Sequence, residues 1–159
     1  MVAMIQTHNI AKELEETLLQ LDGSIEKMER IIQEEREAAH LFAGEDLERL
    51  FDERARCQST LVELESRCRR IMLKAGARMD TPLEQFMVEY VDADVQESLQ
   101  HTRVQVAGRL EAVREATEEN KILLHAAWSV TTHVLHELGA MPVQDAYGTE
   151  AAVAYGGMR

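Results

Sequence analysis

The chain has few of the residues that interrupt helices or favour sheets. Only two of its 159 residues are proline and 4% are aromatic, whereas Ala, Leu, Glu, Arg and Gln, which favour helices, are abundant. With 45% hydrophobic and 29% charged residues, the chain is too apolar for global disorder and long enough for one domain with a real core. The composition therefore predicts a single domain that is almost entirely helical.

Positive charge is also scarce, because 17 Lys and Arg residues face 29 Asp and Glu residues and give a formal net charge of −12. This balance argues against DNA or RNA as a partner, since phosphates require a basic face. Acidic surfaces are weakly attracted to anionic lipids, and no run of about 18 apolar residues exists for membrane insertion. The first nine residues lack the features of a secretory signal. We expect a soluble, cytoplasmic protein.

The chain has only two cysteines and no recognisable catalytic motif. Cys57 and Cys68 are eleven residues apart on one predicted helix, which separates them by about 16 Å, too far for a disulfide. Their spacing suits neither a metal site nor a redox pair, and the sequence contains no phosphate-binding loop or nucleophile elbow. We expect two reduced, buried cysteines, no cofactor and no enzymatic activity.

Two groups of side chains resemble parts of metal sites. Glu37 and His40 form one Glu-x-x-His element, but ferritin-like di-iron sites need two such elements. The other group lies on one predicted helix and consists of His125, His133, His136 and Glu137. Because a physiological site needs ligands from several helices, we expect solvated or capping histidines and no metal. A metal-binding or enzymatic bundle is the least supported function.

Three stretches have apolar residues at alternating spacings of three and four, the pattern of long helices that pack along a seam. The first seam consists of Leu14, Leu18, Leu21, Ile25, Met28, Ile32, Glu35 and Ala39. The second consists of Leu47, Leu50, Arg54, Cys57, Leu61, Leu64, Cys68 and Ile71. The last helix, from about residue 92 or 94 to 138, has a row at spacings of seven that consists of Leu99, Val106, Val113, Asn120, Ala127 and Val134.

Turn and capping signals set the predicted helix ends. Thr7 or Asn9 can cap the first helix, which we keep as one helix through Gly23, and residues 42–44 connect it to the second. The sequence Thr81-Pro82-Leu83-Glu84 predicts a capping box with proline at the first helical position. It opens a short helix, about 82–91, expected to cover one end of the bundle with a face that consists of Leu83, Phe86, Met87 and Tyr90.

Two charged residues occupy positions in the seams. Arg54 in the second seam can reach across to Glu35 in the first. Alternatively, both side chains lie at the edge of the seam with their charged ends in water. We favour the second interpretation, because buried ion pairs are rarely net stabilising.

The predicted fold is an all-α antiparallel bundle of three long helices and one short helix, in one domain over residues 1–139. A flexible tail, residues 140–159, follows the helix stop at Gly139 and Pro142. The three long helices measure about 50, 43 and 70 Å, so the last should extend past its partners by roughly 20 Å at its C-terminal end.

This extension carries an apolar face that consists of Ala126, Ala127, Trp128, Val130, Val134, Leu135 and Leu138. An exposed face of this kind usually marks a partner site, and an amphipathic helix could bind there. Alternatively, the residues are ordinary core, covered by the tail, the short helix or a second copy of the chain. For any single residue, core burial is slightly favoured.

The segment Asn120-Lys121-Ile122-Leu123-Leu124, followed after Gly139 by Tyr147-Gly148, resembles the C-terminal signature of the flagellar export chaperones of the FlgN type. Those proteins carry Asn-x-x-Leu-Leu on a long last helix and a Tyr-Gly pair in a loose tail. The stretches 34–37 and 61–67 are similar to other patterned parts of the family. Together the similar stretches span most of the chain.

The resemblance implies a cytoplasmic type III secretion chaperone that binds C-terminal helical segments of hook-associated proteins, prevents their premature assembly and delivers them to the export gate. The residues implied for client binding are Asn120, Leu123, Leu124, Ala127, Trp128, Val134, Leu135 and Leu138. Tyr147 and Gly148 are implied to dock the chaperone to the export gate or export ATPase, although Tyr155, before Gly156 and Gly157, is an alternative tail tyrosine.

Two alternatives remain open. Asn120 could fix the register of the helices instead of contacting a client, since a polar residue in a seam often does so. The whole protein could instead be a structural coiled-coil protein that forms homo-oligomers through the apolar face of its last helix.

Overall fold

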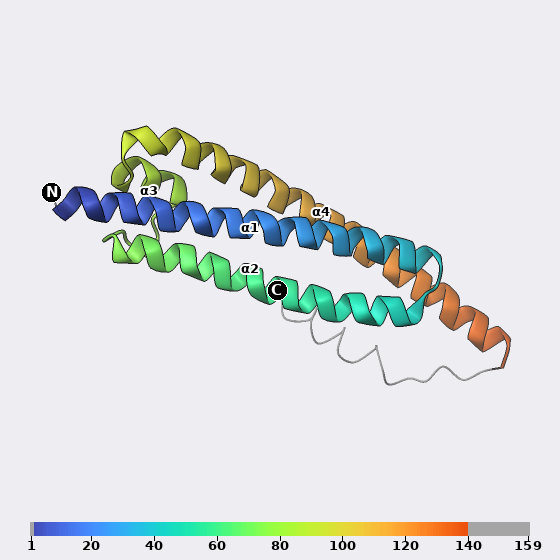
Figure 1. Cartoon of the computed structure of the whole chain (residues 1–159). Coiled ribbons are helices and arrows are strands. Elements are labelled where there is room, and N and C mark those ends of the chain that lie inside the picture. The colour runs from blue at the N-terminus through green and yellow to red at the C-terminus, as the bar shows by residue number, and fades with distance from the viewer. Residues whose placement is uncertain (1, 140–159) are drawn as a thin grey trace.

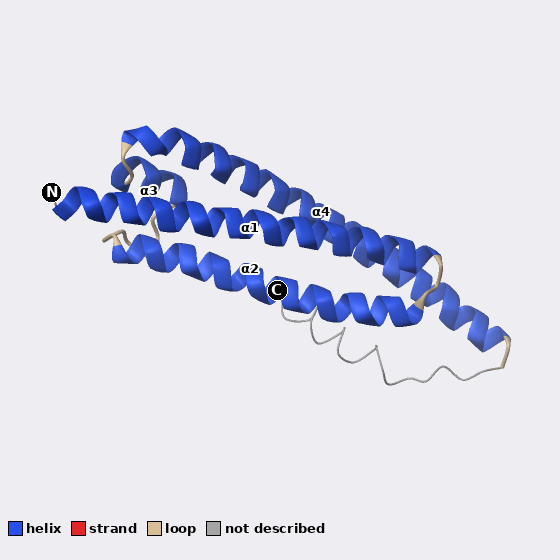
Figure 2. Cartoon of the chain, viewed as in Figure 1, coloured by secondary structure: helices blue, strands red, loops and turns tan. Residues whose placement is uncertain are grey.

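The computed structural model describes residues 2–139, which form four helices and no strand (Figures 1 and 2). Helix α1 spans Val2–His40, α2 spans Gly44–Lys74, α3 spans Leu83–Tyr90 and α4 spans Ala93–Glu137. The all-α prediction is confirmed for this part of the chain. None of the described helices combines the length and the apolar character needed to cross a membrane.

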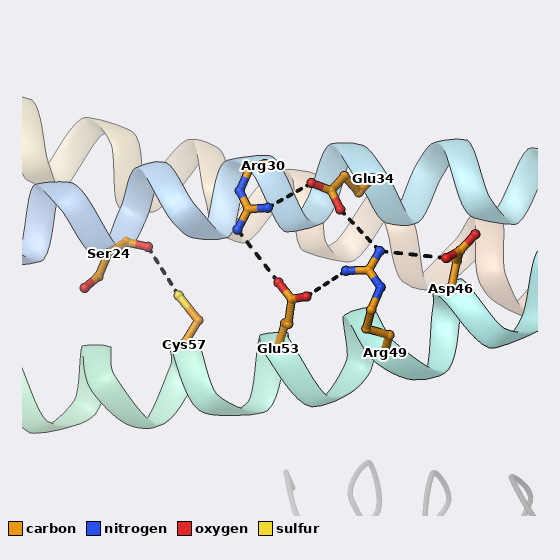
Figure 3. A network of polar contacts seen from close by, with 7 residues as sticks. All are labelled: Ser24, Arg30, Glu34, Asp46, Arg49, Glu53 and Cys57. Atoms are coloured by element: carbon orange, nitrogen blue, oxygen red, sulfur yellow. Dashed lines mark hydrogen bonds and ion pairs between the residues drawn. The ribbon is translucent and has the colours of Figure 1, made fainter.

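Helix α2 runs antiparallel to α1. Near one end of the pair, Arg67 donates to Gln20, and near the other an ion pair joins Arg49 to Glu34. Residue numbers on α2 thus fall as those on α1 rise. Figure 3 shows the second end, where charged side chains of the two helices alternate in a chain of ion pairs. These pairs are exposed to water, so each adds little to stability.

Helix α4 runs parallel to α1 on a different side from α2 (Figure 1). Arg109 forms ion pairs with Asp22 and Glu29, whereas Asn120, further along α4, donates to the carbonyl oxygen of Ile32 at 2.8 Å. Residue numbers on the two helices therefore rise together with a nearly constant offset. That offset determines which part of α4 lies beyond the end of α1.

The core lies along the predicted seams. All eight residues of the first seam are buried. The buried members of the second are Leu50, Cys57, Leu64, Cys68 and Ile71. On α4 the row is buried at Leu99, Val106, Val113 and Asn120, and no residue from 121 to 139 is buried. The core thus ends at Asn120, well before α4 does.

The predicted start of the first helix is wrong. Helix α1 begins at Val2, so Thr7 and Asn9 lie inside it and cannot cap its start. The preceding residues contain no glycine or proline that would stop the helix upstream of the first seam. As predicted, the helix continues through Gly23 without a break.

The capping box before α3 is also wrong, although its position marks the helix start well. Pro82 is itself the N-cap residue, with φ −64° and ψ 147°, and no side chain forms a capping hydrogen bond there. Its carbonyl oxygen accepts the first helical bond from Phe86 at 2.9 Å. Thr81 therefore lies one position too early to cap the helix. Phe86 and Met87 are fully buried, so α3 covers the α1 N-terminal end of the molecule with the predicted face (Figure 1).

Candidate functional site

Helix α4 extends past the turn that joins α1 to α2 (Figure 1). Asn120 lies level with Ile32 and Glu35, with which it forms hydrogen bonds, so the end of α1 at His40 is level with about residue 126. The remaining turns project by about 17 Å at 1.5 Å per residue. We call residues 122–138, which comprise these projecting turns and the turn of α4 beside the end of α1, the overhang segment.

The overhang segment differs in charge from the rest of the chain. Residues 122–136 contain no Asp, Glu, Lys or Arg, although 29% of the whole chain is charged. Solvated helices normally carry charged residues on their outer side. An uncharged stretch of this length at the end of a helix therefore indicates a surface that another segment or molecule covers.

One side of the overhang segment is apolar, and it continues the side that is buried further upstream. Its members are the sequence-predicted residues Leu123, Leu124, Ala127, Trp128, Val134, Leu135 and Leu138, which helical spacing places on the side of Asn120. We call these seven the apolar face. Trp128 is 48% exposed and Val134 49%, and Leu138 is more exposed still. Among the described residues, neither α1 nor α2 covers these three side chains, because both helices end before reaching them. The alternative in which the tail covers this face concerns residues outside the described part of the chain.

Asn120 belongs to the core and not to the exposed apolar face. It is 1% exposed. Its amide nitrogen donates to the Ile32 carbonyl oxygen and to Glu35 Oε2, and its side-chain oxygen accepts from Arg36 Nε at 2.6 Å. These bonds, made inside the bundle, join α4 to α1 at one register and favour the register alternative for Asn120.

Glu35 is buried and its ion-pair partner Arg54 is only 12% exposed, so the interpretation that placed both ends in water is wrong. Arg54 Nε donates to Glu35 Oε1 at 2.8 Å, and Arg54 Nη2 donates to the other carboxylate oxygen. Arg54 Nη1 also contacts the Thr117 hydroxyl on α4 at 3.3 Å. The buried carboxylate is tolerated because arginine and Asn120 together supply its hydrogen bonds. This group joins α1, α2 and α4 at the last buried layer before the overhang segment.

The turn between α1 and α2 adds two residues that the sequence analysis missed. Leu41 and Phe42 are large, apolar and mostly exposed, and they lie where α4 leaves α1. The backbone bonds from Phe42 to Ala39 and from Ala43 to Ala38 form a Schellman motif. Phe42 occupies the left-handed position of that motif, with φ 53°, where glycine is usual. Two successive large apolar residues in a short predicted turn were the signal for this feature.

A shallow hollow of about 440 Å³ lies on another side of the overhang segment. Its lining residues are His125, Trp128, Ser129, Thr132, His133 and His136. Within residues 2–139, no group of three or more His, Cys, Asp or Glu side chains is arranged to hold a metal ion.

A second hollow of about 390 Å³ lies between α1, α2, α4 and the loop before α3. Its mostly apolar lining includes Leu18, Cys68, Met72, Val106 and Leu110. Arg69 donates to the carbonyl oxygen of Met79 at 2.9 Å and so holds the loop over it. None of the sequence-predicted site residues lines this hollow.

Tyr147 and Gly148, together with the alternative tyrosine at 155, lie outside the described residues. No family model, curated protein or solved structure matches the chain.

Proposed function

We propose that this protein is a cytoplasmic flagellar secretion chaperone of the FlgN type, built as an antiparallel helical bundle and without enzymatic activity. Its clients are the C-terminal helical segments of hook-associated proteins, which it keeps from premature assembly and delivers to the export gate. The apolar face lies on an overhang segment that has no charged residue from 122 to 136, and this observation carries the proposal.

An amphipathic client helix suits this face because the face repeats the packing surface of the bundle. Upstream, the same side of α4 packs against α1 and is buried at Val106 and Val113. Downstream, Ala127 and Val134 continue that row at spacings of seven, with no described helix packed over Val134. A client helix laid there would bury the row as α1 does upstream, in the helix-in-groove mode.

The tail supplies the second interaction in this proposal. The Tyr147-Gly148 pair, or Tyr155, docks the loaded chaperone to the export gate or export ATPase. A tyrosine in a glycine-rich segment offers a large apolar body with a polar tip. No cofactor takes part, and neither nucleic acid nor the membrane interior is a partner.

Peptide binding to paired variants tests the proposal. Labelled C-terminal peptides of hook-associated proteins are titrated with the full chain while fluorescence anisotropy is followed. Val134→Glu should abolish binding because it places a charge in the apolar face. Val104→Glu is the matched control, since Val104 is a valine of similar exposure, 57% against 49%, near the other end of α4. Equal binding by both variants, or no binding by the wild-type chain, would contradict the proposal.

The competing function, a structural protein that self-associates, uses the same exposed face. Sedimentation of the full chain separates the two. A tight dimer that Val134→Glu dissociates, and that ignores client peptides, would support the structural role. A monomer that binds one peptide would support the chaperone.

A further inference from the structure

The histidine-lined side of the overhang segment is distinct from the apolar face, and client binding does not account for it. Its hollow is lined by hydrogen-bonding side chains, among them His125, Ser129 and His133, with the ring of Trp128 at its edge. Like the apolar face, this side of the overhang segment carries no formally charged side chain between residues 122 and 136. If this side of the helix were exposed to water, charged residues such as lysine and glutamate would be expected on it over four turns.

Thr132, in the middle of this side, has an unmet hydrogen-bonding requirement. Its hydroxyl oxygen is buried and has no hydrogen-bond partner among residues 2–139. Leaving a buried hydroxyl unsatisfied costs roughly 1–3 kcal/mol. A covering segment with backbone or hydroxyl groups would supply a partner once the Thr132 side chain turns outward, and the lining residues, which combine polar groups with the Trp128 ring, suit a polypeptide.

We propose that this side of α4 is the docking site for the chain's own C-terminal segment, residues 140–159. The segment begins where α4 ends, after Gly139, whose φ of 72° is the left-handed conformation that redirects a chain past a helix end. The hollow extends over His125–His136, about 17 Å of helix. Twenty extended residues reach at most about 66–72 Å, so part of the segment suffices to cover it.

The chain's own C-terminal segment is favoured over a second copy of the chain as the occupant of the hollow, because it is covalently attached to α4. A segment joined to the helix by a few residues has an effective concentration in the millimolar range, which exceeds that of a second molecule in dilute solution. While docked, the segment is withheld from other partners. Trp128 belongs to both the hollow and the apolar face, so a molecule that binds the apolar face and shifts this ring disturbs the docked segment.

Energy transfer within the full chain tests this proposal without any client. Trp128 is the sole tryptophan and serves as the donor, and a dansyl group on a Gly156→Cys substitution is the acceptor. The native thiols are both buried, so labelling at neutral pH selects the new cysteine. Thr132→Glu places a charge in the hollow, and Ala126→Glu, at an exposed position of the same segment outside the hollow, is the matched control.

Docking predicts strong transfer in the labelled chain that does not depend on protein concentration. Thr132→Glu should reduce it to the level of the urea-unfolded chain, and Ala126→Glu should retain it, with the helix content of all variants unchanged. Transfer that is already low in the parent chain, or equal in both variants, overturns the proposal. Transfer that rises with protein concentration also overturns it, because a second copy would then be the occupant. Each result is independent of whether hook-associated peptides bind.

Discussion

Glu35 is the single residue whose replacement should cost most. Glu35→Ala leaves the mostly buried Arg54 guanidinium without its carboxylate and Asn120 without one acceptor, so we expect a loss of unfolding free energy on the order of 3–5 kcal/mol. Urea unfolding followed by circular dichroism measures it. The neighbouring Glu34→Ala is the control, because its ion pairs are solvent-exposed and should contribute about 0–1 kcal/mol. Similar losses for the two variants would show that the buried pair has no special role.

Cys68 makes the protein less stable in alkali. Burial raises the pKa of its thiol from 9.0 to about 11, so the folded chain keeps a proton that the unfolded chain loses. Stability from this group is complete below pH 9 and falls as the pH rises from about 9 to about 11. We expect Cys68→Ala to show a shallower fall in unfolding free energy over that range, measured by urea unfolding at several pH values. Parallel pH profiles for the two proteins would exclude this contribution.

The same burial should protect both thiols from reagents. The pKa of Cys57 is raised as well, mainly by burial, and only a thiolate reacts readily. At pH 8 the folded chain should react with a thiol reagent far more slowly than the urea-unfolded chain. Rapid labelling of the folded protein would mean that α2 opens locally around these residues.

Individual buried positions could be predicted well from the sequence where a periodic pattern decides them. All members of the first seam are buried, including Glu35, because spacing alone assigns a residue to a helix side. The partners of a buried charge could not be predicted in this way. Arg54 is satisfied by Glu35 and Thr117, and Glu35 by Asn120, an arrangement that depends on three helices in one register.

The turn after α2 is also a Schellman motif, in which Gly76 donates to Leu73 and Ala77 donates to Met72. The turns after α1 and α2 differ in one residue, and this difference predicts opposite effects of substitution. After α2 the left-handed position is Gly76, with φ 94°, whereas after α1 it is Phe42, with φ 53°. A non-glycine residue in this conformation costs about 1–2 kcal/mol. Because the Phe42 side chain is 63% exposed, Phe42→Gly gives up little burial and should raise the unfolding free energy by about 1 kcal/mol.

The matched control is Gly76→Ala, which should lower the unfolding free energy by a similar amount, since φ there is strained for any side chain. Thermal unfolding of both variants gives the comparison. A destabilised Phe42→Gly chain would mean that the ring packs against the molecule instead of facing a partner. A residue that lowers stability while remaining exposed points to a binding role, so client affinity should fall in the same variant.

The first and last residues of the helices were predicted less accurately than their buried sides, because a helix end depends on a few local residues. The capping box at Thr81 has the right residues, yet Pro82 adopts extended ψ and becomes the N-cap itself. The start of α1 lies before Thr7 because its first residues have no helix breaker. The end of a helix depends on the backbone conformation of a single residue, which several neighbouring residues can adopt. The apolar pattern along one side of a helix repeats over many turns and is therefore easier to predict.

At the scale of the whole molecule, the lengths of the helices determine where stability and binding lie. The unequal lengths predict an extension of α4, and the described residues contain one, with the buried row ending at Asn120. What covers the extension could not be predicted from the sequence. An apolar stripe has the same pattern whether it is buried by the chain itself or by a partner.

Because the row on α4 is buried up to Asn120 and not beyond it, valine-to-alanine substitutions should affect stability differently in the two parts of this helix. Val106→Ala and Val113→Ala empty space in the core, where both side chains are buried, and should lower the unfolding free energy by on the order of 1–3 kcal/mol. Val134→Ala, in the same row but half exposed, should change it by less than about 0.5 kcal/mol. Urea unfolding of the three full-length variants measures this. If Val134→Ala cost as much as Val113→Ala, the overhang segment would be part of the cooperative core, and its apolar face would not be free to bind a client helix.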